Sequence, residues 1–114
     1  MRTGNVKSDA PPPLQGGIHR SELPRLELLL SFEAAARHLS FTFAANELAL
    51  TQSAVSRQIQ QMEEGLGVAL FERRHRALAL TDAGRLMNRA VIDCLERLRD
   101  ATASVRATTQ LRQV

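Results

Sequence analysis

Two candidate helices joined by a very short link constrain the fold of this chain more than any other feature. Ser40 is a good N-cap for a short helix from about Phe41 to Leu48, and Thr51 is a good N-cap for a helix from Gln52 to about Glu64. A link of about three residues forces the two helices to cross steeply and to share one small core. Ala49 stands in this turn, where many such motifs have Gly, and is a tolerable departure. The side chains expected to face the shared core are Ala44, Ala45, Leu48, Val55, Ile59 and Met62.

A further helix is predicted before this pair, from about Pro24 to His38. Pro24 suits the first turn of a helix, where its missing N–H is not needed. Leu28 and Leu30 lie off the main apolar stripe, which leaves open a second covered surface of this helix. The stripe recurs every three or four residues, at Leu26, Leu29, Phe32, Ala36 and Leu39.

A β-hairpin is predicted after Gly65 and Gly67, which end the preceding helix. Residues 70–73 and 77–80 are short runs on either side of a basic turn at 74–76. The predicted fold class is therefore mainly α, a winged helix-turn-helix of three helices plus a short β-hairpin wing, followed by a long dimerisation linker helix. We expect a disordered N-terminal tail (1–21), a winged helix-turn-helix domain (22–80), the linker helix (81–108) and a frayed C-terminus (109–114).

The linker helix begins with two capping residues, Thr81 and Asp82, and is predicted to reach about Thr108. Its apolar residues follow an alternating spacing of four and three, which forms an a/d seam over nearly three heptads. A lone helix cannot bury such a seam, whereas a second copy of the chain would bury it. The alternative is that the seam packs on Leu28 and Leu30, and both arrangements can hold in part. The candidate dimerisation residues are Met87, Val91, Cys94, Leu98, Ala101 and Val105.

Polar side chains without a carboxylate line the outward face of the predicted helix at 52–64, as far as Glu63. Carboxylates are penalised beside phosphates, so their absence points to nucleic acid. Gln bonds adenine and Arg bonds guanine in a bidentate manner, and free N–H groups in the first turn favour phosphate. The alternative is an ordinary solvated helix face. The residues of this face are Gln52, Ser53, Ser56, Arg57 and Gln60, with 53–57 at the start of a helix that reads the major groove.

The tip of the predicted hairpin is basic and carries Arg73, Arg74, His75 and Arg76. A wing that follows a reading helix can reach the adjacent minor groove or the phosphates. The alternative is a solvated run of charge. The formal net charge of +3, nearly all of it from Arg, supports a nucleic-acid partner only modestly, because Arg-rich chains also arise from GC-rich coding.

Several function classes find no support in the composition. All four aromatic residues are Phe, so stacking platforms for single-stranded nucleic acid are not expected. Cys94 is the single cysteine, which rules out an internal disulfide, and its place on the seam predicts a buried inert thiol. His38 and His75 are far apart, and no nucleophile–base pair, P-loop or dinucleotide motif occurs, so we expect no metal, cofactor or catalysis. Without a signal peptide or membrane-spanning run, the protein is expected to be soluble and cytoplasmic.

Several linked motifs, in the right order, resemble the N-terminal domain of LysR-type transcriptional regulators. The resemblance covers about Leu23 to Thr108, nearly everything outside the tail. The motifs that carry it are Ser40-Phe41-Thr42, Ala44-Ala45, Leu48, the run from Thr51 to Ile59, the run from Glu63 to Arg73, and Leu80-Thr81-x-Ala83-Gly84.

This resemblance implies sequence-specific binding of double-stranded DNA, with roles for individual positions. Residues 52, 53, 56 and 57 match base- and backbone-contacting positions, and Thr42 matches a phosphate-contacting one. Arg76 matches the wing residue that enters the minor groove, and Arg73 matches a nearby backbone contact. Phe43 departs from the Arg or Lys of many relatives, and could pack against a neighbour instead. The candidate DNA-binding residues are Thr42, Thr51, Gln52, Ser53, Ser56, Arg57, Gln60, Arg73, Arg74 and Arg76.

The resemblance also implies an antiparallel linker-helix dimer, whose two reading helices would bind the half-sites of an interrupted palindromic operator. Family members normally continue into a two-lobed effector-binding domain, so the chain is expected to be an isolated DNA-binding fragment that meets an effector only through a domain outside it. The alternative function is a winged-helix protein-interaction or dimerisation module that does not read DNA. The polar outward face argues against that alternative, because an interaction face would be more apolar.

Overall fold

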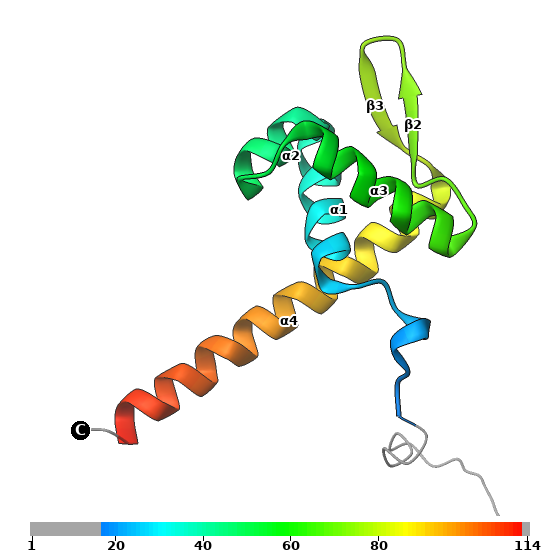
Figure 1. The fold of residues 1–114 in the computed structure, drawn as a ribbon. Coiled ribbons are helices and arrows are strands. Elements are labelled where there is room, and N and C mark those ends of the chain that lie inside the picture. Colours follow the sequence, from blue (N-terminus) through cyan, green and yellow to red (C-terminus); the bar gives the residue numbers. More distant parts are fainter. Residues whose placement is uncertain (1–16, 113–114) are drawn as a thin grey trace, which may run out of the picture.

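The computed structural model describes residues 17–112, which form helices and a single β-hairpin in the order shown in Figure 1. The predicted fold class is confirmed, because three helices and an antiparallel hairpin precede a long helix. The elements are the short 3-10 helix η1 (Arg20–Glu22), α1 (Leu26–His38), α2 (Phe41–Leu48), α3 (Gln52–Leu66), β2 (Phe71–Arg74), β3 (Ala77–Leu80) and α4 (Asp82–Arg112).

The predicted disordered tail, 1–21, lies mostly outside the described residues. Within them, the prediction is wrong at its end, because Arg20–Glu22 forms one 3-10 turn. The backbone N–H of His19 donates to the Glu22 carboxylate over 2.9 Å, and this local bond closes the turn. The tail therefore becomes regular before α1 begins.

Helix α1 begins at Leu26, so the prediction that Pro24 lies in its first turn is wrong, and Pro24 precedes the helix. The predicted stripe is also partly wrong, since Leu26 and Leu39 are 55% and 47% exposed. Leu28, placed off the stripe, is only 6% exposed and packs in the core. The reason is that α1 contacts α2, α3 and α4 together, so its buried face is wider than one stripe and is centred elsewhere.

The helix-turn-helix is confirmed with its two caps. The Ser40 hydroxyl accepts the N–H of Phe43, and the Thr51 hydroxyl accepts the N–H of Ala54, each over 3.1 Å. Ala49 ends α2 in the left-handed region with φ 57°. Helix α3 runs past the predicted end at Glu64 and stops at Gly67, whose φ is 74°.

The hairpin is shifted slightly from its prediction. Strands β2 and β3 pair antiparallel, with Phe71 opposite Leu80 and Arg74 opposite Ala77, so Arg74 belongs to the strand and not to the turn. Leu70, predicted to begin the strand, instead donates its N–H to the Glu63 carboxylate over 2.8 Å. The strand therefore starts one residue later than predicted.

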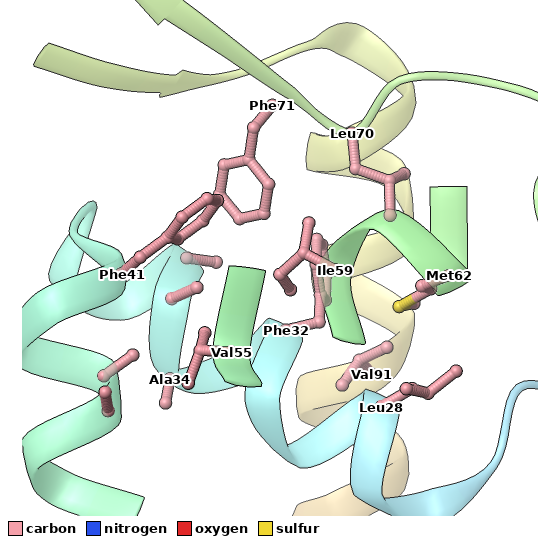
Figure 2. Packing of buried hydrophobic residues seen from close by; sticks show 14 residues of the cluster. Leu28, Phe32, Ala34, Phe41, Val55, Ile59, Met62, Leu70, Phe71 and Val91 are labelled. Atoms are coloured by element: carbon pink, nitrogen blue, oxygen red, sulfur yellow. The ribbon is translucent and has the colours of Figure 1, made fainter. Parts of the chain in front are cut away.

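One core joins α1, α2, α3, the wing and the first part of α4, as Figure 2 shows. Phe71 from the wing lies edge-on to Phe32 of α1 and to Phe41 of α2, with both ring centroids 5.5 Å away. The predicted inward residues of α3 are confirmed, since Val55, Ile59 and Met62 are buried. Val91 of α4 is 2% exposed and belongs to the same core, so the long helix is anchored to the winged domain.

Helix α4 has two different halves. Its start is capped by Thr81, whose hydroxyl accepts the N–H of Gly84 over 2.9 Å. Beyond the anchored part it projects away from the other elements in Figure 1 and continues to Arg112, four residues past the predicted end at Thr108. The hydroxyl of Thr109 donates to the Val105 carbonyl within this last stretch. Within residues 17–112, no helix is long and apolar enough to cross a membrane.

Candidate nucleic-acid interface

The outward face of α3 carries the predicted polar set. Gln52, Ser53, Arg57 and Gln60 are exposed, and Ser56 is half-buried. They lie opposite a buried face, because the inward residues 55, 59 and 62 repeat at helical spacing. The structure therefore brings these predicted residues together on one helix.

A carboxylate stands close to one end of this face. The Gln60 side-chain amide donates to Glu64 over 3.3 Å. The amide is thus held near a negative charge that would be repelled by phosphate. The first two turns, with Ser53 and Arg57, are better suited to meet nucleic acid than the Gln60 end.

Two helix N-termini contribute further donors. Thr51 caps α3, and its hydroxyl also lies 3.4 Å from that of Ser53. Thr42 is exposed in the first turn of α2, directly after the Ser40 cap. Helix N-termini carry partial positive charge and point N–H groups outward, which favours anions such as phosphate.

The two arginines of β2 are not equivalent, although the sequence suggested similar roles. Successive side chains of a strand point to opposite faces, so Arg73 shares the face of the buried Phe71, while Arg74 shares the face of Glu72. Arg74 donates twice to the Glu72 carboxylate, over 3.1 and 2.8 Å. Arg73 instead lies over the Phe41 ring, with its guanidinium carbon 5.0 Å from the ring centroid.

The turn of the wing presents Arg76 and His75, both exposed. Arg76 adopts φ 59°, the left-handed region that non-glycine residues rarely occupy. The chain reverses at this residue, so the guanidinium lies at the far end of the wing. This end projects away from the helices in Figure 1.

Phe43 does not join the core. It is 61% exposed in the first turn of α2, and its ring lies 6.1 Å from that of His38. The expectation that it packs against a neighbour is met only by this surface contact. An exposed apolar ring therefore stands next to Thr42.

Glu63 is a positioning residue that the sequence did not reveal. Its carboxylate accepts the N–H groups of Leu70 and Phe71 over 2.8 and 3.2 Å. These bonds tie the start of the wing to the end of α3. The signal was too weak to read, because a glutamate near a helix end is usually a solvated charge.

A second missed cluster joins α1 to α2. Arg37 donates to Glu33 in its own helix and to Glu47 of α2, with the shortest contact to Glu47 at 2.6 Å. His38 also bonds Glu47 over 2.7 Å. Hydrogen bonds with Arg37, the larger cause, and with His38 lower the pKa of Glu47 from 4.5 to about 2. Bonds to Glu33 and Glu47 raise the pKa of Arg37.

Comparison with known proteins decides the family. Residues 26–85, more than half of the chain, match the bacterial regulatory helix-turn-helix proteins of the lysR family. The chain belongs to the lysR family. It is 48% identical over 85 residues to the glycine cleavage system transcriptional activator of Escherichia coli K12, an alignment that covers 75% of this chain and 28% of that protein. It is 52% identical over 79 residues to the transcriptional activator AmpR of Pseudomonas aeruginosa, with 69% and 26% covered. The chain thus spans about a quarter of the length of these relatives.

Solved structures agree with this family. The DNA-binding domain of BenM in complex with benA site 1 DNA matches with a TM-score of 0.70 and 33% identity, over 75% of this chain and 96% of that chain. The DNA-binding domain of CbnR in complex with DNA matches with a TM-score of 0.67 and 33% identity, over 75% and 98%. The LysR family and the winged-helix fold, both expected from the sequence, are therefore confirmed.

The candidate dimerisation residues of this lysR-family chain fall into two groups. Val91 is buried and Met87 is half-buried against the core, so packing on α1 accounts for the first part of the seam. Leu28 shares that core, whereas Leu30 is 42% exposed. The remaining members are exposed, namely Cys94, Leu98, Ala101 and Val105.

Cys94 corrects a prediction, because its thiol is exposed and not buried in the described chain. The face that α4 turns toward the core carries Val91 and Leu95, and Cys94 lies off it. Helices α1 and α4 form an open groove of about 640 Å³ whose apolar lining includes Leu26, Leu30, Leu95 and Leu98. Residues 17–112 contain no group of three or more His, Cys, Asp or Glu that could hold a metal ion.

Proposed function

We propose that this chain binds double-stranded DNA in a sequence-specific manner, as the dimeric DNA-binding part of a bacterial LysR-type transcriptional regulator. The observation that carries the proposal is the polar face of α3, where Ser53, Ser56 and Arg57 stand together opposite a buried apolar face. The similarity to BenM and CbnR domains, each in complex with DNA, supports it. Such a binder would act in the bacterial cytoplasm and needs no catalytic group.

The exposed polar and basic side chains support the following proposed contacts. Residues 52–57 enter the major groove, where the Gln52 amide can donate to and accept from adenine, and the Arg57 guanidinium can donate twice to guanine. Thr42 and Arg73 contact phosphates, which fix the register without reading sequence. Arg76 reaches the minor groove from the tip of the wing. Arg74 adds less, because Glu72 already neutralises much of its charge.

A second copy of the chain is proposed to cover the distal half of α4. Leu98 and Val105 are 54% and 65% exposed, and an antiparallel partner helix would bury both. Two reading helices related by a two-fold axis then bind two half-sites of an interrupted palindrome. The first bound half raises the effective concentration of the second.

Selection of bound sites from random duplex DNA, followed by a salt titration, tests this function. We expect an enriched, two-fold symmetric site whose affinity falls steeply with salt, because each neutralised phosphate releases counterions. A scrambled duplex serves as the control and is expected to bind about a thousandfold more weakly. Failure to enrich any sequence, with salt-insensitive or absent binding, would overturn the proposal in favour of a protein-interaction module.

Arg57→Ala then tests base reading. If Arg57 grips a guanine, the variant loses about 1–3 kcal/mol on the selected site and relaxes specificity at one base pair. The control is Arg106→Ala, which removes the same charge from the distal, exposed part of α4. An equal loss on every sequence would assign Arg57 to a phosphate instead.

A further inference from the structure

The guanidinium of Arg73 lies over an aromatic ring that is packed into the core. Its carbon is 5.0 Å from the centroid of the Phe41 ring, within the range in which a cation is attracted by the negative face of an aromatic ring. Phe41 is only 7% exposed, and the Phe71 ring meets it at an interplanar angle of 90°. Phe71 in turn packs against Phe32, so the three rings brace one another. Figure 2 shows the Phe41 and Phe71 rings next to each other.

The wing backbone brings Arg73 to this ring. Phe71 and Arg73 lie two residues apart on β2, and therefore share the face that points toward the helices. The side chain reaches a cleft of about 200 Å³ between α3 and the wing, which Ser56, Gln60 and Glu63 also line. The Glu63 carboxylate accepts the N–H groups of Leu70 and Phe71 there. Within residues 17–112, no carboxylate lies within ion-pair distance of Arg73, in contrast to Arg74 and its partner Glu72.

We propose that Phe41 is a positioning residue for DNA binding, whose ring holds the Arg73 guanidinium at the cleft between α3 and the wing, ready to meet a phosphate. This inference rests on the proposed DNA-binding function and names how one of its contacts is ordered. A guanidinium stacked on a ring keeps its N–H donors free at its edge. Because the side chain is already ordered, binding costs less rotamer entropy than it would for a mobile arginine.

A double-mutant cycle on DNA affinity separates positioning from simple packing. Phe41→Leu is expected to weaken binding to the selected site by about three- to tenfold when Arg73 is present. In the Arg73→Ala background the same change is expected to have no further effect, because the group that the ring positions is gone. An equal loss in both backgrounds would show that Phe41 only supports the fold, and would overturn the inference.

A second variant keeps the ring volume while inverting its charge distribution. Phe41→pentafluorophenylalanine keeps an aromatic ring of similar shape, yet turns its negative face positive. We expect it to weaken DNA binding at least as much as Phe41→Leu does. Because the edge-on contact with Phe71 changes as well, the thermal midpoint is measured on the same sample. Wild-type affinity in this variant would overturn the inference even if Phe41→Leu were too unstable to measure.

A measurement without DNA reports the contact itself. The Arg73 Nε–H resonance in a ¹⁵N-correlated NMR spectrum should carry an upfield ring-current shift that Phe41→Leu abolishes. If that shift is present but the wild type binds no duplex, the proposed function fails and the positioning role fails with it. If the wild type binds DNA and the shift is absent, only the positioning role is overturned.

Discussion

The winged domain and the distal half of α4 are held in opposite ways. Every element of the winged domain contributes to one core, from Leu28 in α1 to Phe71 in the wing. Helix α4 joins that core as far as Leu95, but its later apolar residues, such as Leu98 and Val105, are more than half exposed. The winged domain buries its apolar side chains within one chain, whereas the distal half of α4 leaves its apolar side chains exposed.

This difference matches the two proposed roles, DNA binding by the winged domain and pairing of two copies by the distal part of α4. A small domain with few buried residues depends on close packing and on its caps to hold a polar helix face in place. The proposed pairing would stabilise the distal helix by contacts with a second copy, because helices gain most of their stability in proteins from packing. Substitutions in the winged domain should therefore change the free energy of unfolding, whereas substitutions in the distal half of α4 should change the association state.

Val91→Asp and Leu98→Asp test this division most strongly. Val91 is 2% exposed, so a carboxylate there is buried without a partner, and we expect a loss of roughly 4 kcal/mol or more in the free energy of unfolding. Leu98 lies one heptad later and is 54% exposed, so the same charge should leave the fold intact and convert a dimer to a monomer. Urea titration and light scattering measure the two effects. Similar losses in the free energy of unfolding for both variants would contradict this division between the two regions.

Gly84→Ala is expected to have the next largest effect. A Cβ at this position would overlap the Leu70 carbonyl and lie 2.9 Å from a Leu80 methyl group, so α4 could no longer approach the wing as closely. We expect a destabilisation of roughly 3 kcal/mol, measured by urea titration. Gly65→Ala is the matched control, since nothing lies within 4 Å of its added Cβ, and should stabilise α3 by about 0.5–1 kcal/mol. Equal effects at both glycines would contradict the close anchoring of α4.

The success and failure of the sequence interpretation follow the same division. The helix-turn-helix was predictable because its signals are local: Ser40 and Thr51 cap the helices beside them. The buried face of α1 was not, since it depends on packing against three other helices at once. Nor could the sequence show that Glu63 holds the wing, or that Arg73 and Arg74 differ, because strand pleating and distant partners decide both. The polar face of α3 was predicted from periodicity, whereas the contacts of its residues with DNA stay predictions.

Ala49→Gly is expected to stabilise the winged domain. Ala49 adopts φ 57° at the turn between α2 and α3, where a Cβ is strained and glycine is not. The relief is partly offset by the larger entropy of glycine in the unfolded chain, so we expect a stabilisation of about 0.5–1 kcal/mol by thermal unfolding. No gain, or a loss, would show that the turn holds Ala49 without strain.

The smallest expected effect concerns pH and the Arg37–Glu47 pair. Hydrogen bonds with Arg37 and His38 lower the pKa of Glu47 from 4.5 to about 2. The ionised Glu47 therefore stabilises the fold fully above pH 4.5, and this stabilisation is lost as the pH falls toward 2. Glu47→Gln should therefore lose less stability than the wild type across that interval. The difference should be slight, because exposed ion pairs contribute little. Glu96→Gln on α4 is the control, and a pH profile of Glu47→Gln that matches the wild type would discount the pair.

The relation between the two regions is tested most directly by measuring the affinity of the wild type and Leu98→Asp for a full selected site and for one half-site, at one salt concentration. If the winged domain reads and α4 pairs, the wild type binds the full site at least about a hundredfold more tightly than the half-site. Leu98→Asp then binds both duplexes with the half-site affinity of the wild type. Binding of the full site by Leu98→Asp as tightly as by the wild type would contradict a dimer formed through α4.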